Sequence, residues 1–172
     1  QRQMCIRDRN FAFFEKWGSK GFEWLEEMMG YIGDGPITIA DAKRGDIGNT
    51  AKQYAASIFG HFDFDSVTLS PYMGEDSIMP FLDNEEKGVF ILCRTSNPSA
   101  KTFQSLNFHN EVKLYEQVAK WADSLNDNDN VGLVVGATAP EELIKVRRLA
   151  PSLPILICLL YTSPSPRDQC LS

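Results

Sequence analysis

Short runs of β-branched and apolar residues alternate with segments of helical periodicity along most of the chain. Consecutive positions within each run are apolar, which is typical of strands that a parallel sheet buries on both faces. Regular alternation of such strands with helices indicates βα units, so we predict an α/β domain built on a parallel sheet. The five predicted strands are 37–43, 65–70, 88–94, 130–137 and 153–157.

Helical periodicity fills the segments between these strands. Apolar residues three and four positions apart recur in each segment, as on the side of a helix that faces a core. We expect Asn49 or Thr50 to cap the second helical region, and Gly18 and Gly21 to divide the first. The predicted helical regions are 11–29, 51–59, 112–125 and 138–149.

The pattern fits both a sheet closed into a (β/α)8 barrel and an open, doubly wound sheet. Neither GxGxxG nor GxxxxGK follows any predicted strand. Because these are the common nucleotide-binding sequences of open sheets, their absence favours the barrel. A complete barrel needs about 250 residues, whereas this chain has 172. We therefore predict an incomplete TIM barrel with about five of its eight strands.

The two ends of the chain differ in character from everything between them. Residues 1–9 and 158–172 do not continue the internal pattern, and both look like translated sequencing-adapter read-through. Such segments are set aside before fold reasoning, as tags and fusion scars are. We expect a partial barrel domain over residues 10–157 and no strand from either end; authentic disordered tails are the alternative.

Composition and charge narrow the range of partners. With 17 basic and 23 acidic residues the net charge is −6, which repels a phosphate backbone unless positive groups are locally concentrated. No apolar run reaches the roughly 18 residues of a membrane span, and the first ten residues contain no signal-peptide core. We expect a cytoplasmic protein that binds neither nucleic acid nor membrane.

The segment ADAKRGDIGNT, residues 40–50, ends a predicted strand and opens a helix. Asp41 and Lys43 are two residues apart and therefore point the same way from a strand. The carboxyl ends of the strands are where barrel enzymes keep their active sites, and Asp46 follows in the loop. Charge alone leaves two interpretations open: an ordinary ion pair in a solvated loop, and a catalytic array.

Residues 41–50 resemble the signature of orotidine 5′-phosphate decarboxylases, in particular that of the microbial branch. Asp, Lys, Asp, Ile and Thr occupy relative positions 1, 3, 6, 7 and 10 of this segment. Other strings agree in the same order over nearly all of residues 10–157. They are NFAFFEKWGSKG, VTLSPYMG, TSNP at 95–98 and VVGAT at 134–138.

The resemblance implies loss of CO₂ from orotidine 5′-phosphate to give UMP in pyrimidine biosynthesis, without cofactor or metal. It makes Lys43 the ammonium that stabilises the ring carbanion and delivers the proton, and Asp41 the group that holds the lysine and crowds the departing carboxylate. Asp46, Ile47 and Thr50 match residues that reach across a homodimer interface into the neighbour's site. Ser96 matches a serine that binds the pyrimidine amide.

Each of these residues also has an ordinary structural interpretation. Asp46 is then a loop charge, Ile47 a core residue, Thr50 a helix cap and Ser96 a turn former. For Thr50 the cap and the substrate contact are compatible with each other.

The chain departs from the family pattern at both ends. The family carries a further lysine, followed by proline, just before the string aligned with NFAFFEKWG, whereas this chain has Asp8 and Arg9 there. The first strand, with its ribose-binding aspartate, is missing. So are the glycine-rich phosphate-binding strand and the arginine that would follow residue 157. We expect the 172-residue chain as it stands to be inactive.

Two other functions remain open. A sister barrel enzyme such as a hexulose-phosphate synthase shares the Asp-x-Lys-x-x-Asp element, but it binds magnesium through an acidic residue on the preceding strand and gives no reason for TSNP. The chain could also be a catalytically dead barrel fragment that serves only as an assembly partner. Activity of a complete version would separate these possibilities.

Overall fold

The computed structural model describes residues 6–33, 35–108, 111–138 and 140–158. Six parallel strands form one sheet, in which each strand pairs with its neighbour in sequence, in the order β1-β2-β3-β4-β5-β6. All five predicted strands are confirmed, with ends that shift by one or two residues. The strands are β1 Ile6–Asn10, β2 Ile37–Arg44, β3 Ser66–Leu69, β4 Gly88–Arg94, β5 Val131–Gly136 and β6 Ile155–Cys158.

The expectation that neither end contributes a strand is wrong for residues 6–9 and for Cys158, which ends β6, while residues 1–5 and 159–172 lie outside the described residues. Ile6–Asn10 form β1, which pairs with β2 in a regular parallel register from Ile6 opposite Ile37 to Asn10 opposite Asp41. Its sequence, IRDRN, lacks an apolar run, so only its pairing with β2 identifies it as a strand. The described chain therefore holds six strands of a barrel, one more than predicted.

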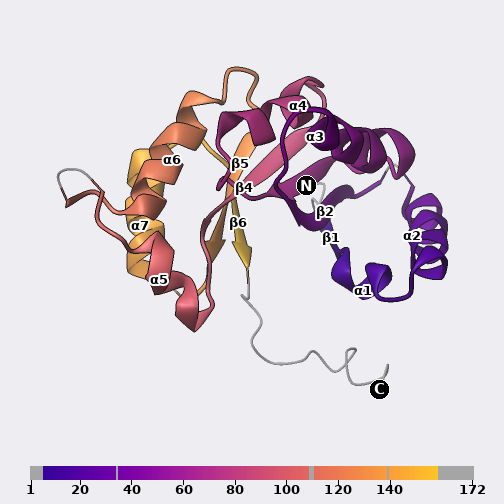
Figure 1. The fold of residues 1–172 in the computed structure, drawn as a ribbon, viewed down its shortest axis with the longest axis horizontal. Helices are drawn as coiled ribbons and strands as arrows, with labels where there is room; N and C mark the ends of the chain where they lie inside the picture. The colour runs from indigo at the N-terminus through magenta and orange to yellow at the C-terminus, as the bar shows by residue number, and fades with distance from the viewer. Residues whose placement is uncertain (1–5, 34, 109–110, 139, 159–172) are drawn as a thin grey trace.

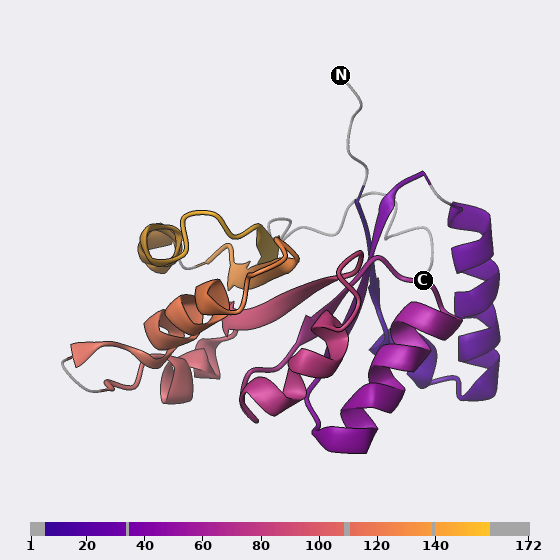
Figure 2. The ribbon, with the colours of Figure 1, turned by 90° about the horizontal axis from the view of Figure 1, so that it is seen from above.

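Helices cover one side of the curved sheet (Figures 1 and 2). Gly18 separates the first two helices, as predicted, but Gly21 lies inside α2. A Cβ at Gly21 would come within 1.9 Å of the Phe14 carbonyl oxygen, so this glycine allows α1 and α2 to pack closely. The α-helices are α1 Ala12–Glu15, α2 Ser19–Ile32, α3 Gly48–Ala55, α4 Met79–Leu82, α5 Lys101–Gln104, α6 Leu114–Ser124 and α7 Pro140–Leu149.

The helical region predicted at 51–59 begins earlier and changes type midway. α3 starts at Gly48 with Ile47 in an extended conformation before it, so neither Asn49 nor Thr50 caps the helix. From Ala56 to His61 the chain continues as a π-helix, η1. Two short 3₁₀ helices, η2 Glu75–Ser77 and η3 Pro98–Ala100, follow β3 and β4.

A single apolar core joins the sheet to the helices that cover it. No helix in the described ranges is both long and apolar enough to cross a bilayer. The fold is an incomplete (β/α)8 barrel, as predicted, in which β1 and β6 each have one pairing partner among the described strands. Strand residues in the core include Ala40, Val67, Leu69, Val89, Ile91, Val131, Leu133 and Val135, and helix residues include Leu25, Ala51, Ile58, Phe81, Tyr115, Ala119, Ala122 and Val146.

Candidate active site

Asp41 lies near the carboxyl end of β2 and accepts hydrogen bonds from three side chains. Lys43 Nζ is 2.5 Å from Asp41 Oδ1, and the Thr68 hydroxyl of β3 donates to the same oxygen at 3.0 Å. Asn10 of β1 donates to Asp41 Oδ2 at 3.0 Å. Both carboxylate oxygens are therefore engaged by neighbours from three adjacent strands. This arrangement fixes the carboxylate in position.

Lys43 ends the regular part of β2 in a left-handed backbone conformation, with φ of 47°. The register between β2 and β3 shifts between Ala40 and Arg44, and the Lys43 amide donates to the Thr68 hydroxyl at 3.0 Å. Left-handed φ values are uncommon for residues other than glycine and persist where surrounding contacts hold them. The backbone conformation and the Asp41 ion pair together define where the half-exposed ammonium lies.

Asp41 and Lys43 thus lie side by side, as strand alternation predicts. Two of their partners, Thr68 and Asn10, were not among the predicted site residues. Both stand in strings already noted, VTLSPYMG and NFAFFEKWGSKG, but neither string by itself indicates a contact with Asp41. Only the register of the strands β1 and β3 against β2 could have indicated them, because it determines which side chains lie beside Asp41.

Asp8 of β1 brings a second carboxylate to the same group of charges. Partial removal from water raises the pKa of Asp8, and the nearby Asp41 carboxylate raises it further, against the opposing effect of Lys43 and Arg9. Burial, followed by the charges of Asp41 and Asp8, also raises the pKa of the Cys158 thiol at the end of β6. Two acidic side chains therefore share one nearby ammonium, where the family pattern has a lysine in place of Asp8.

The remaining signature residues, Asp46, Ile47 and Thr50, lie apart from this group. Asp46 Oδ1 accepts the backbone N–H of Ile47 at 2.8 Å, and the Ile47 side chain is 50% exposed. Thr50 is exposed in the first turn of α3. In the described part of the chain, no hydrogen bond or ion pair joins Asp46 to Asp41 or Lys43. The exposure of Ile47 also contradicts its interpretation as a core residue.

Ser96 lies in the loop after β4, packed against the end of β5. A Cβ on Gly136 would be 2.7 Å from both the backbone nitrogen and the Cβ of Ser96, so only glycine leaves room for this loop. The Thr138 hydroxyl donates to the Ser96 carbonyl oxygen at 3.3 Å. Ser96 is therefore held at the carboxyl ends of the strands, the same end of the sheet as Asp41 and Lys43.

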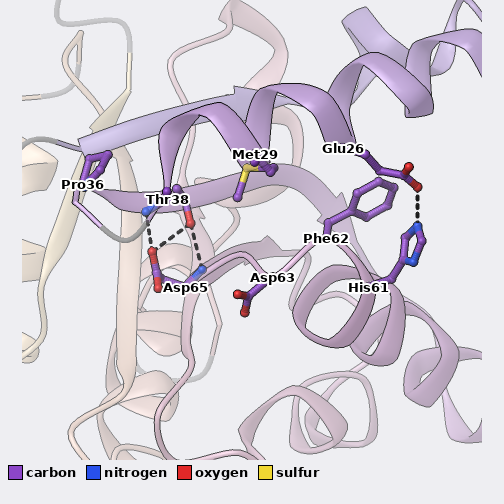
Figure 3. A pocket seen from close by; sticks show the side chains of 10 residues that line it. Glu26, Met29, Pro36, Thr38, His61, Phe62, Asp63 and Asp65 are labelled. Atoms are coloured by element: carbon purple, nitrogen blue, oxygen red, sulfur yellow. Dashed lines mark hydrogen bonds and ion pairs between the residues drawn. The ribbon is translucent and has the colours of Figure 1, made fainter.

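A cavity of about 460 Å³ opens at the opposite end of the strands (Figure 3). Asp65 accepts the backbone N–H and the hydroxyl of Thr38 at 2.7 and 2.8 Å, which ties the start of β2 to the start of β3. On the far wall His61 pairs with Glu26 at 2.6 Å. Polar contacts at the amino-terminal face of a barrel stabilise the fold, whereas catalysis occurs at the other face. We assign this cavity no catalytic role.

The incomplete parallel barrel, with a charged group at the carboxyl ends of its strands, defines the class, that of the (β/α)8 barrel proteins. Residues 2–157 match the model of the orotidine 5′-phosphate decarboxylase / HUMPS family. The chain belongs to this family.

Relatives in two microorganisms carry the name orotidine 5′-phosphate decarboxylase. The protein of Halorubrum lacusprofundi is 52% identical over 149 residues, and that of Dehalococcoides mccartyi is 51% identical over 157 residues. These matches cover 86% and 90% of this chain. The chain spans only 52% and 58% of the relatives' lengths.

Solved structures agree with the sequence matches. The OMP decarboxylase of Leishmania donovani has a TM-score of 0.84 at 46% identity, over 87% of this chain and 60% of that one. A putative orotidine-monophosphate decarboxylase from Toxoplasma gondii has a TM-score of 0.88 at 39% identity, over 92% of this chain and 62% of that one. The half-barrel therefore superimposes on part of a longer barrel.

These lengths define a version of the protein suited to experiment, called here the completed chain. It consists of residues 6–157 of this sequence, joined to the preceding and following segments of the Dehalococcoides mccartyi relative. Asp8 is retained in it unless a substitution is stated.

The raised pKa of Asp8 predicts a pH-dependent gain in stability from Asp8→Asn. A carboxyl whose pKa is higher in the folded state than 3.8 binds its proton more tightly there. Its contribution to stability is then complete below that pH and is lost as pH rises through the folded-state pKa. We expect Asp8→Asn in the completed chain to raise the urea midpoint at pH 7 and to change it less at pH 3. A gain that is equal at both pH values would contradict the assigned cause.

Proposed function

We propose that the full-length protein containing this chain decarboxylates orotidine 5′-phosphate to UMP in pyrimidine biosynthesis. The observation that carries the proposal is the Asp41–Lys43 pair, held by Thr68 and Asn10 at the carboxyl ends of three adjacent strands. We further propose that the protein acts in the cytoplasm and without a cofactor. The net charge of −6 on these 172 residues argues against a nucleic-acid partner.

The proposed reaction breaks the bond between the ring carbon and the carboxylate, and the electron pair stays on the ring as CO₂ leaves. An ammonium already in place stabilises this developing carbanion without reorganisation. Lys43 fills that role and transfers its Nζ proton to the carbon, after which water restores the proton. Asp41 orients the ammonium through their ion pair, and its own negative charge disfavours the substrate carboxylate beside it.

One lysine cannot account for the whole rate enhancement. A single preorganised donor typically contributes about 3–4 kcal/mol to catalysis, whereas very large enzymatic accelerations need about 23 kcal/mol. Binding contacts remote from the reacting carbon must supply the difference. In this proposal Ser96 binds the pyrimidine amide, and Asp46, Ile47 and Thr50 act from the partner subunit of a homodimer. The exposure of Ile47 and Thr50 supports that arrangement.

Replacing Lys43 tests the proposal most directly. In the completed chain carrying Asp8→Lys, we expect Lys43→Ala to reduce turnover to below about a hundredth, because one general acid typically contributes at least that much. Binding of UMP should persist, since ribose and phosphate contacts remain. Turnover is measured by the ultraviolet absorbance change of the pyrimidine and UMP binding by calorimetry. Retention of more than a hundredth of the activity would remove Lys43 from the proposed role.

The hexulose-phosphate synthase alternative has one observation in its favour. Asp8 is an acidic residue on the strand that precedes Asp41, where that enzyme needs a magnesium ligand. The completed chain with Asp8 retained is therefore assayed with hexulose phosphate and Mg²⁺ as well. The proposed function would be replaced if the Asp8 protein turned over hexulose phosphate and the Asp8→Lys protein did not turn over orotidine 5′-phosphate. Failure of both reactions would favour the remaining alternative, a catalytically dead barrel that serves as an assembly partner.

A further inference from the structure

Gln104, the last residue of α5, holds the loop after β4 with both ends of its side-chain amide. Its Oε1 accepts the backbone N–H of Thr95 at 2.9 Å, and its Nε2 donates to the Thr95 hydroxyl at 2.8 Å. The two bonds fix both the backbone and the side chain of Thr95. Neither Gln104 nor Thr95 is fully buried, so core packing alone does not determine this geometry.

Arg94 determines which way round the amide of Gln104 lies. The Arg94 side chain is almost fully buried, and its Nη1 lies 3.4 Å from Gln104 Oε1 and 2.5 Å from the Thr95 carbonyl oxygen. A guanidinium only donates hydrogen bonds, so the amide oxygen must face Arg94 and the amide nitrogen must face the Thr95 hydroxyl. Glu142 of α7 pairs with Arg94 Nη2 at 3.5 Å and helps to hold the guanidinium in place.

These contacts fix the residue immediately before Ser96. The Thr95 hydroxyl donates onward to Asn97 Oδ1 at 2.6 Å, so the residue after Ser96 is tied to the same network. From the other side, Gly136 allows close packing and Thr138 binds the Ser96 carbonyl oxygen. Ser96 thus sits between two fixed neighbours, in a loop that α5 holds on one side and β5 on the other.

We propose that Gln104 is a positioning residue, which acts through Thr95 to set the position of Ser96 for the substrate. The inference rests on the proposed function, in which Ser96 binds the pyrimidine amide. Gln104 need not touch the substrate itself. Its loss leaves Ser96 chemically intact but held by fewer contacts, which reduces the benefit of a preorganised hydrogen bond.

Three variants of the completed chain carrying Asp8→Lys isolate the amide. Gln104→Met keeps the side-chain length and removes all three hydrogen bonds of the amide, two with Thr95 and one with Arg94. Gln104→Glu keeps the acceptor for Thr95 N–H and Arg94. Lys101→Met, at an exposed position of the same helix, is the matched control. Loss of the two hydrogen bonds to Thr95 predicts a fall in kcat/KM of about tenfold for Gln104→Met, a smaller fall for Gln104→Glu and none for Lys101→Met. The exchange of the Thr95 amide hydrogen should also become about tenfold faster in Gln104→Met.

A double-mutant cycle with Ser96→Ala separates positioning from general stability. If Gln104 acts through Ser96, the double variant Gln104→Met, Ser96→Ala should be no slower than Ser96→Ala alone. Additive losses, or an unchanged Thr95 exchange rate, would overturn the inference and leave the proposed function standing. Absence of decarboxylation by the completed chain that carries Asp8→Lys alone would instead overturn the proposed function, and the inference with it.

Discussion

Asp8→Lys should convert the completed chain from an inactive protein into a decarboxylase. With Asp8 in place, two carboxylates share the Lys43 ammonium, and a further negative charge faces a reaction that develops a carbanion. Removing one preorganised donor costs about 10²–10³ in kcat, and here a repelling charge stands in its place. We therefore expect kcat/KM for orotidine 5′-phosphate to rise by at least about a thousandfold, as measured by product formation under saturating and limiting substrate.

Two control variants test whether the charge and the position of the lysine introduced at residue 8 both matter. Asp8→Asn removes the extra negative charge without supplying a cation, so it should recover only a small part of the activity. Arg9→Lys places a lysine one residue along β1, where strand alternation directs it to the other face, and should recover none. An inactive Asp8→Lys protein with a normal circular dichroism spectrum would contradict this prediction and overturn the proposed function.

Mixing two inactive variants should restore activity if Asp46 serves the partner subunit. In the proposed homodimer each site takes Lys43 from one subunit and Asp46 from the other. A heterodimer of Lys43→Ala and Asp46→Ala then has one site with both substitutions and one with neither. Random exchange makes half of the dimers mixed, so turnover should recover to at most about a quarter of the parent. Both variants are made in the completed chain carrying Asp8→Lys.

The matched control for this experiment uses two residues that are in contact within one subunit. Asp41 and Lys43 form an ion pair along β2, so a mixture of Asp41→Ala and Lys43→Ala contains no intact site and should stay inactive. Isotope-labelled subunits analysed by native mass spectrometry verify the exchange. Verified heterodimers that stay inactive with Asp46→Ala would mean that Asp46 acts on its own subunit.

Strand and helix patterns predicted most of the fold because buried parallel strands are apolar along their whole length. The prediction for residues 1–9 is wrong because IRDRN carries no such pattern and resembles adapter read-through, and its assignment as β1 depends on pairing with β2. The sequence does not predict the change from α3 to the π-helix η1, because Ile58 and Phe59 continue the α-helical spacing of Ala51, Tyr54 and Ala55. The prediction that Gly21 divides a helix is wrong, because a glycine that ends a helix and one that allows close helix packing look alike in sequence.

In the candidate site too, contacts between residues close in sequence could be predicted, whereas contacts between residues far apart in sequence could not. Side-by-side placement of Asp41 and Lys43 follows from their spacing of two, and the structure has them in contact. The roles of these two residues, and those of Asp46, Ile47, Thr50 and Ser96, stay predictions. Thr68 and Asn10 could not be predicted because each lies on a neighbouring strand, far in sequence from its partner Asp41. Gln104 could not be predicted because no sequence pattern specifies which group its side-chain amide binds.

The strands follow the same order in the sheet as in the chain, and this order affects how the protein can fold during synthesis. Each strand from β2 onward pairs with one that the ribosome has already synthesised, so the sheet can grow one βα unit at a time during translation. Such growth closes only short loops, whose entropic cost is small and increases slowly with length. In a full-length barrel only the last pairing, between the first and final strands, has to wait for the whole chain to emerge.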